Sequence, residues 1–201
     1  MKPIKTGVMG GTFNPPHNGH LTAAMNARAA LGLDRVLFIP TNIPPHKQLP
    51  TGSATTAQRC EMVRRMTAPY PWAAFSDLEV ARGGASYTVD TLRQLHAQGC
   101  EDLTLIVGTD MLLSFDRVWR APEEIVRLAD LAVVARGADD RPDLARKAEA
   151  LRRQYGARIH LVDGPVLEVS STELREGGSI ASLTPPAVAA YILENRLYQH
   201  C

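Results

Sequence analysis

The 201-residue sequence lacks an excess of charge of either sign. Lys and Arg number 22 and Asp and Glu number 21, which gives a formal net charge of +1. This balance provides no general electrostatic attraction for DNA, RNA or an anionic membrane surface. Aromatic residues make up only 5% of the chain, which also disfavours the base-stacking surface of an RNA-binding protein. Any polyanion that binds should therefore be small and held locally.

Long apolar segments and paired cysteines are also missing. No run of about 18 apolar residues occurs, so we expect no membrane span, and residues 1–6 carry no apolar signal segment. Cys60, Cys100 and Cys201 are odd in number and show no CxxC spacing, which indicates neither a disulfide framework nor a zinc site. We expect a cytoplasmic protein without nucleic-acid or membrane partners. The sequence leaves open whether it is a monomer or a homo-oligomer.

Apolar residues make up 45% of the chain, enough for a globular core, and the length suits one domain over residues 1–201. Short aliphatic runs alternate with helical patterns. The expected strands are 4–9, 35–39, 103–107, 131–135 and 159–162, with a short one inside 72–80, and the expected helices are 21–31, 56–66, 88–98, 141–155, 171–176 and 185–195. This alternation predicts an α/β fold, a Rossmann-like doubly wound parallel sheet of about five or six strands with helices on both faces. Ligands bind such sheets beyond the carboxyl ends of the strands.

The first expected strand runs into the string GGTFNPPHNGHL, residues 10–21. Gly10 and Gly11 allow the backbone to approach an anion, and the start of the next helix offers free N–H groups to phosphate. His17 and His20 lie three residues apart at that helix start, where both can donate to a phosphoryl group. Each piece alone is commonly a turn or a cap, but the combination is not. Neither GxxxxGKS/T nor GxGxxG is present, so the sequence indicates a phosphate site built with histidines.

This string resembles the HxGH signature of one class of nucleotidyltransferases, and in its full length it resembles the bacterial nicotinate-nucleotide adenylyltransferases. The family often has an acidic residue where this chain has Asn14, and a turn-forming side chain is retained. The resemblance implies that ATP binds at Gly10, Gly11, Thr12, Phe13, His17 and His20, and that Thr12 also contacts the mononucleotide.

A Pro-rich loop over residues 41–56 contains the motif PPHK, which ends in His46 and Lys47. From the residues alone, a Pro-Pro turn with a solvated lysine is as reasonable as a mobile loop that closes over a triphosphate. The resemblance favours the second interpretation. It implies that His46 and Lys47 contact ATP and that Thr41 and Asn42 contact the mononucleotide.

Two further segments match the family. The SYT segment containing Tyr87 and Thr88 could simply cap the following helix, but the resemblance implies that it recognises the pyridine ring and its carboxylate. Asp110 could cap a helix and Trp119 could belong to the core. The resemblance implies instead that Gly108 and Asp110 contact ATP, that Asp110 also contacts the mononucleotide, and that Trp119 stacks on the nicotinate ring.

The segment SSTELR is common by chance, but it matches the signature that completes the HxGH class. There it implies that Ser171, Thr172 and Arg175 hold the β- and γ-phosphates. Arg136 follows the fifth expected strand and is assigned to ATP, although the proline that the family commonly has after it is lacking. The residues expected to be catalytic are His17, His20, Lys47 and Arg175.

The implied reaction is adenylyl transfer from ATP to nicotinate mononucleotide, by in-line attack and without a covalent enzyme intermediate. Mg²⁺ is expected to be held by substrate oxygens and water, and no metal site of the protein is expected. One alternative is another HxGH adenylyltransferase, with nicotinamide mononucleotide or phosphopantetheine as acceptor, but such an enzyme is not expected to combine the PPHK, SYT and GxD-Trp segments. A non-catalytic nucleotide sensor on the same scaffold is disfavoured by the intact histidines.

Overall fold

The computed structural model describes residues 3–45, 48–135, 140–165 and 167–198. Six strands form one parallel sheet in the order β3-β2-β1-β4-β5-β6. The strands are β1 (Lys5–Gly11), β2 (Arg35–Pro40), β3 (Ala73–Phe75), β4 (Asp102–Gly108), β5 (Asp130–Val134) and β6 (Ile159–Val162). The predicted α/β fold with a doubly wound parallel sheet is therefore confirmed.

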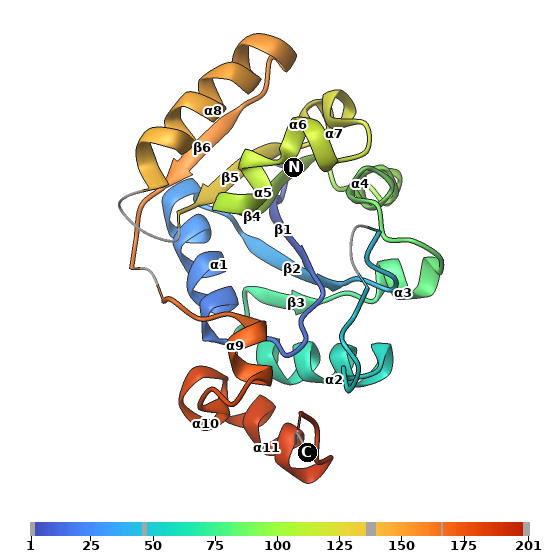
Figure 1. Cartoon of the computed structure of the whole chain (residues 1–201). Coiled ribbons are helices and arrows are strands. Elements are labelled where there is room, and N and C mark those ends of the chain that lie inside the picture. Colours follow the sequence, from blue (N-terminus) through green and yellow to red (C-terminus); the bar gives the residue numbers. More distant parts are fainter. Residues whose placement is uncertain (1–2, 46–47, 136–139, 166, 199–201) are drawn as a thin grey trace.

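Helices follow most strands and cover both faces of the sheet (Figure 1). They are α1 (Asn18–Leu31), α2 (Thr56–Thr67), α3 (Leu78–Arg82), α4 (Thr88–Ala97), α5 (Thr109–Leu113), α6 (Phe115–Val118), α7 (Pro122–Leu128), α8 (Arg141–Tyr155), α9 (Ser171–Arg175), α10 (Ile180–Leu183) and α11 (Pro186–Glu194). In the described part of the chain, no helix is long and apolar enough to cross a membrane.

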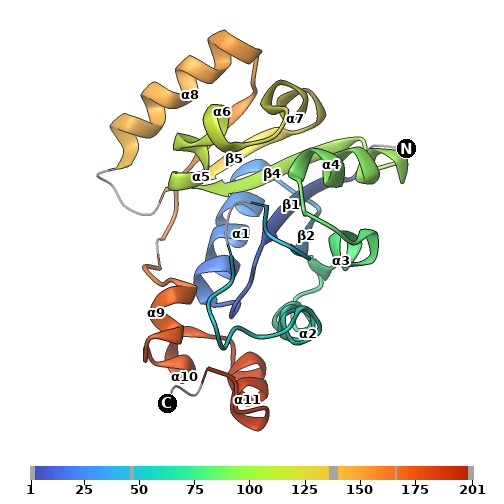
Figure 2. The same cartoon turned by 45° about the vertical axis from the view of Figure 1, so that its right-hand side comes forward.

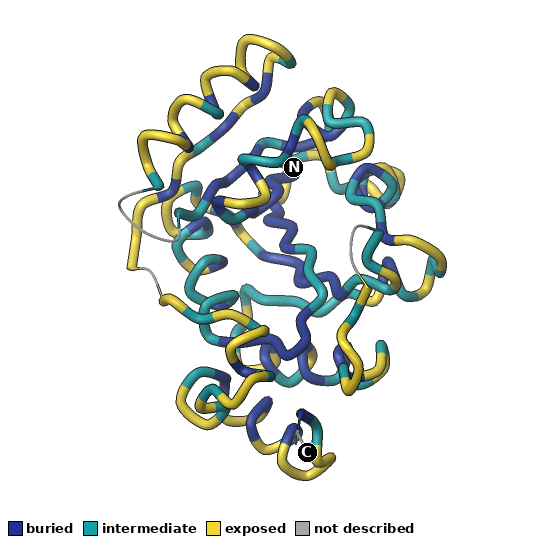
Figure 3. The backbone as a smooth tube through the Cα atoms, viewed as in Figure 1, coloured by how far each residue is buried: buried dark blue, intermediate teal, exposed yellow. Residues whose placement is uncertain are grey.

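Alternate residues of the central strands point into two separate apolar layers. Val8 and Leu105 belong to the layer beneath α4, α5, α7 and α8. Met9 and Ile106, each the next residue along its strand, belong to the layer beneath α1, α2 and α11. The central strands β1, β2, β4 and β5 are mostly buried, whereas the outer faces of the helices are exposed (Figure 3). Because helices cover both faces of the sheet, successive strand residues are mostly apolar, which explains near-continuous apolar runs such as LTLIV.

The expected long helices and strands are found, with ends that shift by one to three residues. The helices α3, α5, α6, α7 and α10 are absent from the sequence prediction, because four to seven residues are too few to show a clear 3.6-residue period. The short strand expected inside 72–80 is Ala73–Phe75, and α3 follows it.

The chain order of the strands reverses between β1 and β4, which are hydrogen-bonded neighbours. At such a reversal the crossover helices leave to opposite faces, and a crevice opens beyond the strand ends. Gly10 and Gly11 end β1, and Gly108 ends β4. An added Cβ at Gly10 or Gly108 would meet no atom within 4 Å, so both strand ends leave open space above the sheet.

The C-terminal helices α9, α10 and α11 lie together at one end of the molecule, beside α2 and the start of α1 (Figures 1 and 2). α11 packs against α2, and Val188 and Ile192 join the apolar layer beneath α1 and α2. This arrangement brings the SSTELR segment to the same edge of the sheet as the GGTFNPPHNGHL segment.

Candidate active site

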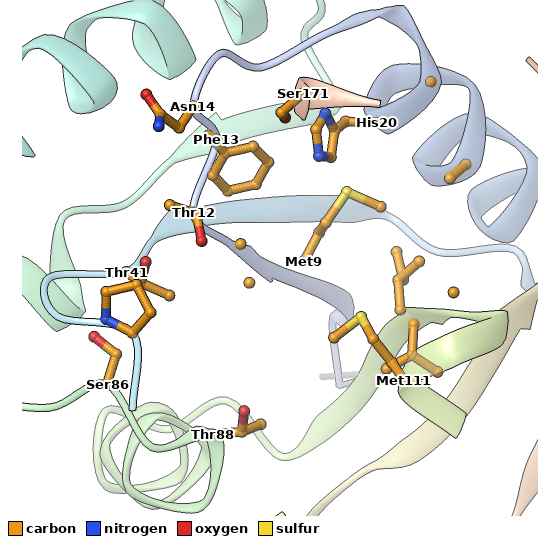
Figure 4. A pocket seen from close by; sticks show the side chains of 18 of the residues that line it. Met9, Thr12, Phe13, Asn14, His20, Thr41, Ser86, Thr88, Met111 and Ser171 are labelled. Atoms are coloured by element: carbon orange, nitrogen blue, oxygen red, sulfur yellow. The ribbon is translucent and has the colours of Figure 1, made fainter. Parts of the chain in front are cut away.

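A cavity of about 740 Å³ lies beyond the carboxyl ends of the central strands. It brings together most of the site residues predicted from the sequence. The predicted residues that line it are Gly10, Gly11, Thr12, Phe13, His17, His20, Thr41, Tyr87, Thr88, Gly108, Trp119, Ser171, Thr172 and Arg175. Figure 4 shows Ser86 and Thr88 on one side and His20, Phe13 and Ser171 on the other. Segments that lie far apart in the sequence therefore meet around one space.

Five predicted residues are not among the lining residues. Asn42 and Asp110 are described but do not line the cavity; Asp110 is exposed in the first turn of α5. His46, Lys47 and Arg136 lie outside the residues that the structure describes.

The two histidines of the HNGH segment form a pair at the start of α1. His17 is buried at the N-cap, and its backbone N–H donates to His20 Nδ1 at 3.2 Å. The ring centroids lie 3.8 Å apart, and the Phe13 ring lies 4.9 Å from that of His20. Gly19 makes this packing possible, because an added Cβ would lie 3.0 Å from His17 Nδ1 and 2.8 Å from Val169 Cγ1.

Burial and the neighbouring His17 together keep His20 in its neutral form. Burial, and then the neighbouring His17, hold the pKa of His20 well below its ordinary value, although the bond from the His17 backbone opposes this. The ring is therefore neutral near pH 7. Because Nδ1 accepts a hydrogen bond, the proton of the neutral ring must sit on Nε2. His20, which lines the cavity, thus carries one N–H donor, at Nε2.

Hydrogen bonds connect the SSTELR segment to the loop after β1. Arg175 Nη1 donates to the carbonyl of Asn14 at 2.7 Å and to that of Ser171 at 2.9 Å, and Nη2 donates to Thr172 Oγ1. Ser171 Oγ donates to the carbonyl of Pro15 at 2.8 Å. A guanidinium carries five N–H donors, so Arg175 can hold this loop and still donate to an anion.

The Asn14 side chain joins three segments and is 2% exposed. Its Nδ2 donates to Ser53 Oγ at 2.8 Å, while its Oδ1 accepts from the Ala54 N–H and from the Tyr198 hydroxyl at 2.7 Å. Burial raises the pKa of Tyr198 far above its ordinary value, so the hydroxyl remains a donor. An amide suits this position because it donates and accepts at once.

A buried cation that the sequence analysis did not identify lies under the same loops. Arg59 of α2 is fully buried, and its guanidinium donates to the carbonyls of Thr12 at 2.7 Å and Asn42 at 3.2 Å, and to Thr56 Oγ1. Burial lowers the pKa of Arg59. Arg59 therefore connects the loop after β1 with the loop after β2.

At the other end of the cavity, Asn42 holds the segment before α4. Its backbone N–H donates to Ser86 Oγ at 2.8 Å, and its Nδ2 donates to the carbonyl of Gly84. Asn42 thus positions Ser86, which lines the cavity. Thr41 Oγ1 lines the same space, is buried, and has no hydrogen-bond partner in the described part of the chain, which leaves it available to a ligand.

Glu79 is the sole acidic side chain among the described residues that line the cavity. Its Oε1 accepts from Thr91 Oγ1 at 2.6 Å. Burial raises the pKa of Glu79, against hydrogen bonds from Thr91 and Ser86 and the charge of Arg82. No group of three or more His, Cys, Asp or Glu side chains suited to a metal ion occurs in the described ranges.

The sequence was compared with protein-family models and with known proteins. The cytidylyltransferase-like family model matches residues 8–177. A "Probable nicotinate-nucleotide adenylyltransferase" from Pelobacter propionicus is 40% identical, over 98% of this chain and all of the relative. A protein of the same name from Roseiflexus sp. is 42% identical over 99% of this chain and all of the relative. The chain belongs to the nicotinate-nucleotide adenylyltransferase family. The resemblance inferred from GGTFNPPHNGHL is thus confirmed at full length.

Solved structures agree on the fold. The nicotinic acid mononucleotide adenylyltransferase of Plasmodium falciparum, solved in complex with NaAD, has a TM-score of 0.74 and 18% identity, with 96% of this chain and 97% of that chain covered. A second structure of the same enzyme, complexed with APC, has a TM-score of 0.70 and 17% identity, with 96% of each chain covered. At this level of identity the match establishes the arrangement of the sheet and helices.

Proposed function

We propose that the chain transfers the adenylyl group of ATP to the phosphate of nicotinate mononucleotide, which yields the deamido form of NAD and pyrophosphate. The observation that carries this proposal is one cavity that joins the His17–His20 pair to the Tyr87–Thr88 segment. The names of the full-length relatives support the same substrates. The activity belongs to NAD biosynthesis, and we place it in the cytoplasm, in one domain over residues 1–201, with small molecules rather than nucleic acid as partners.

The proposed reaction is an in-line displacement at the α-phosphorus of ATP. An oxygen of the mononucleotide phosphate forms the new P–O bond while the bond to the β-phosphate oxygen breaks, and pyrophosphate leaves with the electron pair. His20 donates from Nε2 to an α-phosphate oxygen, where negative charge develops. Arg175 donates to the departing pyrophosphate, and Lys47 is assigned the same role from the sequence. No side-chain nucleophile takes part.

The remaining site residues assigned from the sequence are part of the proposal. Gly10 and Gly108 leave room beyond adjacent strand ends for the nucleotide. Thr41 offers its unpaired hydroxyl to the mononucleotide, and Trp119 offers its ring for stacking. Mg²⁺ would reach the site with ATP, held by phosphate oxygens and water, where it neutralises phosphate charge. Glu79 lies near the residues assigned to the mononucleotide, and we do not assign it as a ligand of Mg²⁺.

A closely related alternative is transfer to nicotinamide mononucleotide or to phosphopantetheine. The test is to measure pyrophosphate release from ATP in the presence of Mg²⁺ with each of the three acceptors in parallel, and to identify the product by mass. The proposal expects the highest kcat/KM with nicotinate mononucleotide. Equal or greater activity with the amide, or activity only with phosphopantetheine, refutes it. ATP binding without pyrophosphate release for any acceptor would favour a nucleotide sensor.

A further inference from the structure

The cationic side chain of Arg120 lies at the acceptor end of the cavity, which is the end formed by the residues assigned to the mononucleotide. The function proposed above gives this side chain no role. Arg120 lines the cavity beside Tyr87, Thr88 and Trp119. Its guanidinium carbon lies 4.7 Å from the centroid of the Tyr87 ring. Across the described ranges of the chain, Arg120 is exposed and makes neither a hydrogen bond nor an ion pair with the protein. Its N–H donors therefore remain available to a ligand.

The backbone around Arg120 has an unusual conformation. The short helix α6 ends at Val118, and Ala121 then adopts φ 52° and ψ 56°, a left-handed conformation that residues other than glycine rarely take. Pro122 begins α7 directly afterwards. This turn presents two neighbours to the cavity: the Trp119 ring, which packs 5.2 Å from that of Phe115, and the Arg120 guanidinium, which lies over Tyr87. Strained backbone of this kind commonly occurs where side chains are held for a ligand.

The acceptor must lie in the cavity in one direction. Its phosphate has to reach the α-phosphate of ATP beside His20, whereas Thr88 lies across the cavity from His20 (Figure 4). The pyridine ring therefore points toward the side formed by Tyr87, Thr88 and Trp119. Since Arg120 shares that side, its charge acts on the ring substituent more than on the phosphate.

The ionised form of Glu79, at this end of the cavity, favours an amide over an acid. Glu79 is the neighbouring acidic side chain, and its Oε2 accepts no hydrogen bond in the described part of the chain. When Glu79 is ionised, this oxygen attracts an N–H donor and repels a carboxylate. A cation at this end favours the acid beyond what the Tyr87–Thr88 segment supplies, and Arg120 is the basic side chain that lines the cavity there among the described residues.

We propose that Arg120 is a specificity-determining residue, whose guanidinium binds the carboxylate of the nicotinate ring and makes the enzyme prefer the acid over the amide mononucleotide. This inference rests on the proposed function. A charge-assisted bond to a carboxylate is stronger than a bond to a neutral amide oxygen. Exposure to solvent limits the difference to about tenfold, equal to about 1.4 kcal/mol.

The test compares Arg120→Gln with Arg117→Gln, an exposed arginine one turn earlier that does not line the cavity. At saturating ATP and Mg²⁺, kcat/KM is measured with nicotinate mononucleotide and with nicotinamide mononucleotide, and Kd is measured for each by calorimetry. Arg120→Gln should lower the acid-to-amide ratio of kcat/KM about tenfold, mainly by loss with the acid. Arg120→Lys should restore part of the ratio, and Arg117→Gln should leave it unchanged.

Two outcomes overturn the inference. An equal loss with both acceptors would mean that Arg120 serves the common phosphate or the shape of the cavity, and an unchanged ratio would mean that its charge is not used. Failure of the proposed function differs from both, because the wild-type protein itself would then give no transfer to nicotinate mononucleotide. Thermal unfolding of each variant shows whether the fold is intact.

Discussion

Replacing Arg59 with methionine should destabilise the fold and impair the binding of ATP. The guanidinium supplies three hydrogen bonds, to the carbonyls of Thr12 and Asn42 and to Thr56 Oγ1. Methionine keeps much of the apolar volume but offers no donor. The two loops that Arg59 connects would lose their shared attachment.

The magnitude follows from the groups left behind. Each of the two part-buried carbonyls that loses its donor costs about 1–3 kcal/mol. The desolvation of the buried guanidinium is removed at the same time, and this offsets part of the loss. We therefore expect Arg59→Met to lower the free energy of unfolding by about 2–4 kcal/mol.

Urea denaturation followed by tryptophan fluorescence measures this change. Arg64→Met is the matched control on the same helix. Arg64 has a side chain that is 56% exposed and pairs with Glu61, so its loss should cost less than about 1 kcal/mol. If Arg59→Met lowers stability no more than Arg64→Met does, the assigned role of the buried cation is wrong. Arg59→Met should also raise the KM for ATP, because Thr12 lines the cavity.

Three further predictions concern the loop after β1 and the start of α1. Gly19→Ala places a Cβ 3.0 Å from His17 Nδ1 and should lower kcat about tenfold or more by shifting that ring; a loss under about threefold would contradict the packing argument. Tyr198→Phe removes one of two donors to Asn14 Oδ1 and should cost about 1 kcal/mol in urea denaturation, whereas unchanged stability would show that the bond contributes nothing. Folding lowers the pKa of His20, so the unfolded chain binds a proton at this ring more tightly than the folded protein does. The free energy of unfolding should therefore fall as the pH drops below about 6.5, the ordinary pKa of histidine. His20→Gln should weaken that pH dependence, and identical pH profiles for the two proteins would count against the neutral ring.

Local patterns predicted the sheet and the gathering of the site. The aliphatic runs of the strands and the glycines after them are local features, and parallel strands necessarily place their carboxyl ends at one edge. GGTFNPPHNGHL was recognisable because strand, turn and helix start are contiguous in the sequence. The site residues it contains, from Gly10 to His20, accordingly line the cavity.

Contacts between distant segments could not be predicted. Asn14 was interpreted as a turn residue, but its partner Tyr198 lies 184 positions away. Arg59 does carry a signal, because it shares a helix face with Met62, Val63 and Met66, all of them buried. An arginine on an apolar face indicates a buried hydrogen-bonded cation, but nothing local identifies the carbonyls it binds.

The histidine pair tests the central claim most directly. The rate of dinucleotide formation from ATP and nicotinate mononucleotide should be measured for the wild-type protein and for His20→Ala, with thermal unfolding recorded for both. The account predicts that His20→Ala lowers kcat by roughly two or more orders of magnitude while the fold remains intact. A folded His20→Ala protein that turns over at close to the wild-type rate would contradict it.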